Sequence, residues 1–568
     1  MLVLFYTILT IQQYNNTTIQ AIHPKHTIQI MKTFSFKQLR LFLIPLSIFA
    51  VCNVIKAQQS PKPSVCGLTA QDSRIIYNEM IELRERFPLV APMRAVAYVP
   101  VWFHLVAKTD GTGRVSMLKV LDMLCEWNRI YSKNGVELQF YIKGINSINN
   151  SALYTGPMTY EGNNTLRSNK KADGMNVFLV NNANDPSQPN ATILGYYQNT
   201  TTGVPYEADW FVIINSQVST AGAVTIAHEA GHFFSLPHTF LGWESCPFQP
   251  TTTTPCAPAT VNCFDGITYS VENAARTGAT ANCSTAGDGF CDTPPDYNLG
   301  YGYSSCTYIG LTCDPKGVKI NPDETNMMGY FVGCETSFSP MQKTAMQNNY
   351  LNHAKRSTLR AGNIQPSAAA FTLATPTLLS PINGAKTTYF NNFTLTWQAV
   401  PNATAYVVEI SKASTFFDSR SFTANTAALN INKSMADGYF TATNITYYWR
   451  VKPYNGFAAC AAVSAGQTFK TGLLNATHEI VGVSSFDISP NPLSKSQVLE
   501  LNLVTETAFD AQVTLYNMTG QVLKTEKRHF EAGISNQSLS ISDLNNGIYI
   551  LSLESERGIL NKKLVIKD

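Results

Sequence analysis

Hydrophobic and polar positions change their pattern along the chain of 568 residues. Between residues 98 and 361, apolar stretches typical of strands, at 98–107, 175–180 and 210–214, alternate with segments of helical spacing. The clearest of these is 116–132, where apolar residues recur every three or four positions and predict an amphipathic helix. This part of the chain is therefore expected to mix helices with strands.

Two later segments alternate apolar and polar residues with the period of two that strands require. Residues 375–472 place Trp397 and Trp449 on early and late strands, and residues 484–568 carry short strands separated by Pro and Gly. The first segment is therefore expected to be rich in strands, and the second predicts a small all-β sandwich. The residues at 366–370 are expected to form a flexible linker.

The start of the chain has the pattern of a secretory signal. A basic region that begins at Met31 precedes the apolar run 41–54, and Ala57 stands where a peptidase would cut. That run is too short to cross a bilayer, which takes about 20 residues. We expect residues 1–57 to be a signal region with Met31 as its true start, and we expect no membrane span further along.

Charge and cysteine content add to this picture. The 41 basic and 38 acidic side chains nearly balance, which argues against a nucleic-acid partner. Charged residues make up 14% of the chain, where about 25% is usual, and this composition is typical of exported β-rich proteins. Eight of the twelve cysteines crowd one Gly- and Pro-rich segment without Cys-x-x-Cys pairs, so disulfides are favoured over a zinc cluster: Cys246, Cys256, Cys263, Cys283, Cys291, Cys306, Cys313 and Cys334.

Three histidines fall in the eleven-residue run His-Glu-Ala-Gly-His-Phe-Phe-Ser-Leu-Pro-His. His228 and His232 lie one helical turn apart on the same face, so both reach one metal ion. Pro237 disfavours further helix, which lets His238 return as a third ligand on an irregular turn. Three neutral imidazoles leave zinc a fourth position for water, and Glu229 is placed to accept a proton of that water.

The run resembles the zinc-binding motif of the metzincin peptidases, His-Glu-x-x-His-x-x-Gly-x-x-His. Its ending His238-Thr-Phe240 resembles the pappalysin branch, which includes the cytophagalysin- and ulilysin-like enzymes. Three further segments match that branch in order: Gly287-Asp-Gly-Phe-Cys-Asp-Thr-Pro294, Asn326-Met-Met-Gly-Tyr330 and Phe338-Ser-Pro-Met-Gln342. One position departs from the motif, because Ser235 stands where the motif has a glycine in the left-handed conformation. A side chain in that conformation costs about 1 kcal/mol. The alternative third ligand is a carboxylate further along the chain.

The resemblance implies a secreted zinc endopeptidase that acts on proteins or peptides. Its catalytic domain, residues 96–361, would have the α+β metzincin fold with a mixed twisted sheet, an active-site helix and a disulfide-rich lower subdomain. Met328 would be the methionine-turn residue below the ligands. Tyr330 would either stabilise the oxyanion or be a buried tyrosine bonded to backbone. The rival function is a surface adhesin that keeps the peptidase scaffold without turnover.

Two further features concern calcium and latency. Asp288, Asp292 and Asp296 recur every four residues in the cysteine-rich segment, and oxygen ligands grouped in this way are candidates for binding calcium, which some relatives of the resembled family bind. Turn formation is the alternative for these aspartates. Residues 58–95 would be a pro-segment that keeps a zymogen latent. Removal of the signal leaves an odd number of cysteines, and Cys66 is expected either to place its thiolate on the zinc or to pair with Cys125.

The two sandwich segments also resemble known modules. Residues 375–472 are similar to a fibronectin type III domain. The Ser-Pro-Asn-Pro opening, the Gly-x-Tyr strand and the basic-apolar end of residues 484–568 resemble the C-terminal sorting domain of type IX secretion cargo. This implies export through that secretion machinery as a partner, and a secreted or cell-surface location.

Overall fold

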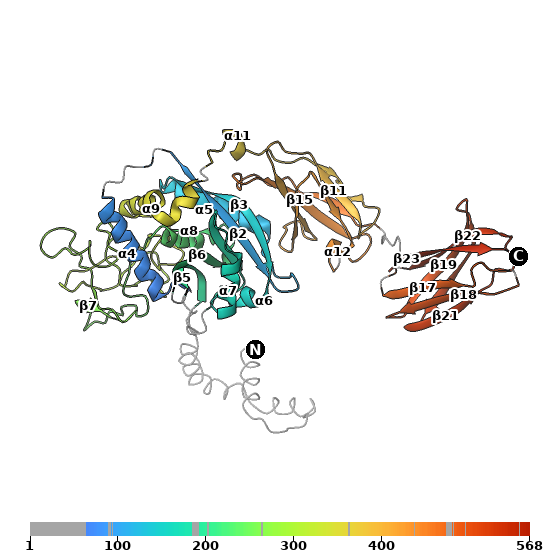
Figure 1. Cartoon of the computed structure of the whole chain (residues 1–568), viewed down its shortest axis with the longest axis horizontal. Helices are drawn as coiled ribbons and strands as arrows, with labels where there is room; N and C mark the ends of the chain where they lie inside the picture. Colours follow the sequence, from blue (N-terminus) through green and yellow to red (C-terminus); the bar gives the residue numbers. More distant parts are fainter. Residues whose placement is uncertain are drawn as a thin grey trace, which may run out of the picture. The chain divides into compact units, whose positions relative to one another are not determined.

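The structure is a computed structural model, and the predicted signal region 1–57 lies outside the residues it describes (Figure 1). The described residues are 64–88, 93, 95–184, 192–201, 204–262, 265–361, 364–436, 438–472, 480, 482–494, 496–555 and 557–567. Within them, no helix is both long enough and apolar enough to cross a membrane.

A six-stranded mixed sheet forms the centre of the first part of the chain. Its spatial order is β1-β5-β6-β4-β2-β3. Strands β6, β4, β2 and β3 are parallel, β5 runs antiparallel to β6, and β1 pairs in parallel with β5. The predicted mixture of helices with a mixed sheet is confirmed. The strand bounds are β1 Ser64–Cys66, β2 Ala97–Ala107, β3 Leu138–Asn149, β4 Met175–Val180, β5 Thr192–Thr201 and β6 Val204–Ile214.

Two apolar cores lie on the two faces of this sheet, because successive side chains of a strand point to opposite faces. In β4, Val177 belongs to one core and Phe178 to the other. Helices α5 (Met117–Lys133) and α8 (Ala223–Phe233) join the first core, whereas α6 (Ser151–Thr155) and α7 (Tyr160–Asn169) join the second. Helix α5 begins after Ser116, whose side chain accepts the amide of Lys119, and it confirms the helix predicted from spacing.

Further helices complete this part of the chain. Helices α4 (Ala70–Arg86) and α9 (Pro340–Asn352) pack against each other. Ser339 and Gln342 form a capping box at the start of α9, which satisfies two orphan backbone amides there. The short helices η1 (Asn215–Gln217), η2 (Ala354–Arg356) and α10 (Ser357–Ala361) connect the larger elements.

The cysteine-rich segment has little regular structure, with two-residue strands β7 (Thr260–Val261) and β8 (Tyr269–Ser270). Disulfides join Cys256 to Cys313, Cys283 to Cys291 and Cys306 to Cys334, and Cys246 is also disulfide-bonded. Cys263 lies outside the described residues. The predicted use of these cysteines as disulfides rather than as a zinc cluster is confirmed for all seven that are described.

The next part is a two-sheet sandwich around Trp397, Tyr406 and Trp449. One sheet has the order β10-β16-β15-β12-β13 and the other β14-β11-β9. The expected linker at 366–370 is wrong in part, since Ala368–Phe371 form the helical turn α11, built from three alanines with high helix propensity. The other bounds are β9 Leu378–Ser380, β10 Ala385–Lys386, β11 Phe393–Trp397, β12 Ala405–Ser411, β13 Arg420–Ala424, β14 Ala428–Ile431, α12 Lys433–Ala436, β15 Thr446–Tyr454 and β16 Gln467–Lys470.

The last part is a second all-β unit with its own apolar core. Its sheets have the orders β17-β18-β21 and β20-β19-β22-β23. Alternate burial along β18 shows the period of two that the sequence predicts. The strands are β17 Val483–Ser489, β18 Leu499–Thr505, β19 Phe509–Asn517, β20 Val522–Phe530, β21 Gly533–Leu539, β22 Gly547–Ser555 and β23 Gly558–Ile566.

A disulfide connects helix α5 to the first sandwich. Cys125 bonds to Cys460, so the alternative in which Cys125 pairs with Cys66 is wrong. The buried Lys452 of β15 also forms an ion pair with Asp122 of α5 at 2.7 Å. Cys66 is the free cysteine of the described residues.

Candidate metal centre

Helix α8 ends in a turn that sends the chain back towards the helix. The amide of Leu236 donates to the carbonyl of Gly231, and the amide of Ser235 donates to the carbonyl of His232. This pattern is a Schellman motif with Ser235 at its left-handed position, where φ is 64°. Ser235 therefore adopts a backbone conformation that favours glycine, and His238 follows where the chain runs back towards the helix.

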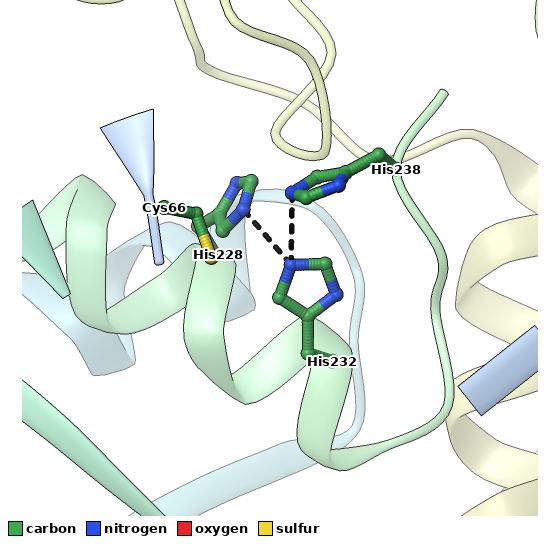
Figure 2. Close-up of side chains that lie close together, drawn as sticks. All are labelled: Cys66, His228, His232 and His238. Atoms are coloured by element: carbon green, nitrogen blue, oxygen red, sulfur yellow. Dashed lines mark hydrogen bonds between the residues drawn. The ribbon is translucent and has the colours of Figure 1, made fainter. Parts of the chain in front are cut away.

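The turn brings the three histidine rings together (Figure 2). His232 Nε2 lies 3.0 Å from His228 Nε2 and 3.2 Å from His238 Nε2. The Nδ1 atom of His228 lies 2.7 Å from the carbonyl oxygen of Met327, and that of His232 lies 2.7 Å from the carbonyl oxygen of Leu236. A carbonyl oxygen only accepts hydrogen bonds, so each of these Nδ1 atoms must carry a proton. The protons of both rings are thus on Nδ1, and unprotonated Nε2 atoms face one another.

This donor set fits a divalent cation such as zinc. Lone pairs about 3 Å apart repel each other unless a positive charge lies between them. Burial lowers the pKa of His228 to about 4 and holds the pKa values of His232 and His238 well below the usual value. All three rings are therefore neutral at pH 7, which is the form in which histidine binds a metal.

The methionine turn lies directly against helix α8. Met328 is fully buried, and its sulfur occupies the space beside Gly231, where an added Cβ would come within 2.5 Å of Sδ. Asn326 holds the turn, because its Oδ1 accepts the amide of Met328 and its side chain pairs with Gln342. Met328 thus acts as a packing residue, while the preceding carbonyl of Met327 orients His228.

Glu229 points its carboxylate into the same site. It is fully buried, and burial raises its pKa to about 8. Oε2 accepts a hydrogen bond from Cys66 Sγ at 3.5 Å. Oε1 is buried and has no hydrogen-bond partner among the described residues. A buried carboxylate oxygen of this kind needs a donor, and a metal-bound water would be one.

Cys66 reaches the histidines from the end of strand β1 (Figure 2). One ligand atom from each of Cys66, His228, His232 and His238 lies within 4.8 Å of the others. Burial and the charge of Glu229 raise the pKa of the Cys66 thiol. The hydroxyl of Tyr330 donates to the backbone carbonyl of Cys66 at 3.1 Å, so this buried tyrosine is bonded to backbone in this state of the chain.

Glu244 is a member of the site that the sequence did not reveal. Its Oε1 lies 3.8 Å from His238 Nδ1, and burial raises the pKa of this carboxyl to about 8. It also accepts the amide of Gly242 and the hydroxyl of Ser73. The distance is too long for a hydrogen bond, and His238 Nδ1 has no hydrogen-bond partner among the described residues. No motif marks Glu244, since its approach to His238 depends on the turn after that histidine.

The three aspartates proposed for calcium serve separate structural purposes. Asp288 accepts the hydroxyl of Thr293, and Asp296 accepts the hydroxyl of Thr239 next to His238. Asp292 accepts the amide of Met341 at the start of α9. Within the described part of the chain, only Cys66 and the three histidines form a group with metal-ligand geometry. The turn-forming alternative accounts for these aspartates, and the calcium prediction finds no support.

A cleft of about 270 Å³ opens beside the cluster. Glu229 and Tyr330 line it near the histidines, while Leu194 and Val224 contribute apolar surface and Glu335 an acidic group. Burial raises the pKa of Glu335. Cys66 also lines this cleft, together with His228.

Comparison with known proteins adds to this geometry. An extracellular metalloprotease of Neurospora crassa is 24% identical over 295 residues, which are 47% of this chain and 91% of that protein. An extracellular metalloprotease of Sordaria macrospora is 24% identical over 291 residues, 48% of this chain and 88% of that protein. Residues 487–567 match the Secretion system C-terminal sorting domain family. The chain is a relative of extracellular metalloproteases that ends in a sorting domain.

The solved structures include a promirolysin variant from Tannerella forsythia. It is 16% identical with a TM-score of 0.35, and the match covers 53% of this chain and 100% of that one. The predicted resemblance to metallopeptidases with a type IX sorting domain is confirmed. The protein is exported and is secreted or held at the cell surface, which confirms the predicted location.

Proposed function

We propose that this chain is a zinc-dependent endopeptidase of the pappalysin branch of the metzincins. The observation that carries the proposal is the convergence of the three histidine Nε2 atoms beside the buried carboxylate of Glu229. His228, His232 and His238 would hold the ion. The metalloprotease relatives support the same reaction class.

Zinc in such a site lowers the pKa of a bound water towards about 7 and polarises the peptide carbonyl. Glu229 would act as general base, because its carboxylate stands beside the ligands and its Oε1 has no hydrogen-bond partner among the described residues. Tyr330 would donate its hydroxyl to the oxyanion once the carbonyl of Cys66 no longer accepts it.

The protein described is proposed to be the latent precursor. Residues 58–95 would be its pro-segment, with the thiolate of Cys66 as the fourth metal ligand. Strand β1 pairs with β5 through Cys66 and Gly195, at the edge of the sheet beside the site. A substrate strand cannot pair with this edge while β1 is present. Loss of the pro-segment would therefore free the metal, the sheet edge and Tyr330 together.

The remaining assignments complete the proposal. Residues 96–361 would be the catalytic domain, residues 375–472 a fibronectin type III domain, and residues 484–568 the module that the type IX machinery handles. Substrates would be proteins or peptides, since the cleft is open and partly apolar.

Glu229→Gln tests the function. The variant and the wild type are converted to the mature form with the same added protease, and zinc content is measured on both. We expect equal zinc and a turnover of a peptide library that falls by about 10² to 10⁴, because only the base is lost. Turnover no higher than background in both proteins would favour the non-catalytic adhesin instead.

A further inference from the structure

Glu79 is a buried carboxylate on helix α4, within the proposed pro-segment. Its Oε2 accepts the hydroxyl of Ser235 at 3.1 Å. Its Oε1 accepts Asn199 Nδ2 at 3.3 Å and Lys355 Nζ at 3.2 Å. We call Asn199, Ser235 and Lys355 the carboxylate cradle.

The cradle is built from three elements that lie outside helix α4. Asn199 belongs to β5, Ser235 to the turn after α8, and Lys355 to η2. Lys355 Nζ also donates to Asn199 Oδ1, and Asn349 Nδ2 donates to Ser235 Oγ at 2.6 Å. These contacts hold Lys355 against Asn199 and orient the hydroxyl of Ser235 without α4, and Glu79 is the residue that bonds to all three cradle side chains.

The charges in and around the cradle favour an anion. Lys355 and Glu79 form an ion pair with both side chains mostly buried. His353 Nε2 lies 3.7 Å from the same carboxylate. Burial lowers the pKa of Lys355, and Glu79 is the strongest opposing charge. The neighbouring Arg356 is paired with Asp209, so that cation already has its own partner.

We propose that the carboxylate cradle is a second anchor of the pro-segment, independent of the metal, whose ligand is the side chain of Glu79. A cut between α4 and β2 leaves both this ion pair and the Cys66 contact in place. The cradle then holds the cleaved helix together with peripheral contacts such as those of Ser73 with Glu244 and of Arg84 with the carbonyl of Gly289. The inference rests on the proposed function in one respect, that residues 58–95 are a removable pro-segment.

Ser235 gains a specific purpose from this arrangement. The motif's glycine would adopt φ of 64° without strain, whereas serine costs about 1 kcal/mol there. The serine hydroxyl is what reaches Glu79. The residue that departs from the zinc-binding motif is thus the residue that connects the metal-binding turn to the pro-segment.

Amide hydrogen exchange of α4 tests the anchor in the full-length precursor carrying Glu229→Ala, which prevents self-cleavage. Glu79→Gln is compared with Glu82→Gln, an exposed position of the same helix. We expect α4 amides to exchange at least about tenfold faster in Glu79→Gln and within about twofold of the parent in the control. Equal exchange in the two variants would overturn the proposal.

Ser235→Ala and Ser235→Gly keep the result interpretable if Glu79→Gln misfolds. Both remove the hydroxyl, but only glycine relieves the strain at the turn. Faster α4 exchange in both variants supports the anchor, and unchanged exchange in both rejects it. Zinc content and peptide turnover of the mature wild type report separately on the proposed function, since α4 exchange requires no catalysis.

Discussion

The backbone conformation of Ser235 follows from the sequence, but the contacts of its side chain depend on the tertiary fold. The sequence predicts a left-handed turn there, because His238 reaches the metal only if the chain reverses after His232. The structure has that turn, with φ of 64°. The contacts that stabilise it come from Glu79 and Asn349, which lie far away in the chain. No local pattern points to either residue.

Cys66→Ser tests latency at the residue scale. A serine hydroxyl is a much weaker zinc ligand than a thiolate, so we expect the uncut precursor to gain measurable peptidase activity. The reference is the wild-type precursor with the same zinc content. Hydrolysis of a short peptide is measured before cleavage of the precursor itself becomes visible on a gel. Unchanged latency would exclude the thiolate as the block on the metal.

The candidate site was predictable to the extent that its residues are close in sequence. The three histidines and Glu229 fall within eleven positions, so helical spacing and one proline suffice to group them. Glu244 could not be found in this way, because its approach to His238 depends on the loop after the third ligand. The regular spacing of the aspartates suggested a calcium site, but their side chains satisfy separate turns and caps.

At the scale of elements, periodicity identified helix α5 and the apolar strands β2 and β4. It could not show that β5 runs antiparallel to β6 or that β1 joins the edge, since strand direction depends on connections between distant segments. The turn α11 was missed because a short alanine run after proline reads equally well as a linker.

Strand β2 contains a buried histidine whose titration links its packing to pH. His104 is fully buried and stacks on Phe178 at 4.0 Å, and Nε2 donates to Asn176 at 3.0 Å. Burial lowers its pKa to about 4, whereas an unfolded histidine titrates near about 6.5. The unfolded chain therefore binds the proton first as pH falls.

We expect this histidine to reduce the free energy of unfolding between about pH 6.5 and pH 4, by roughly 3 kcal/mol at most. The free energy of unfolding keeps its full value above about pH 6.5 and declines as the pH falls towards about 4. Urea unfolding of wild type and His104→Gln across this range provides the measurement. Parallel pH profiles for the two proteins would contradict the prediction.

For the whole molecule, the bond between Cys125 and Cys460 is the feature that the sequence could not reveal. The two residues are 335 positions apart and lie in different predicted domains. The first sandwich is therefore covalently attached to α5, and the hydroxyl of Tyr131 in α5 donates to the carbonyl of Ala227 in α8. A covalent path thus leads from this sandwich to a helix that contacts α8, which carries His228 and His232.

Removing this disulfide should be more costly than removing a short one. Chain entropy gives roughly 6 kcal/mol for the 335-residue separation of Cys125 and Cys460, against roughly 2.5 kcal/mol for the eight-residue separation of Cys283 and Cys291. Calorimetry of the two double Cys→Ser variants compares the losses in thermal stability. An equal or smaller loss for the Cys125 and Cys460 pair would show that the attachment contributes little.

Zinc K-edge X-ray absorption of the full-length precursor tests the central claim most directly. One zinc per chain should show three imidazole nitrogens at about 2.0 Å and one sulfur at about 2.3 Å. Removal of the pro-segment should replace the sulfur with an oxygen and leave the three nitrogens unchanged. Failure to retain zinc after loading, or a zinc shell with fewer than three imidazoles, would contradict the account.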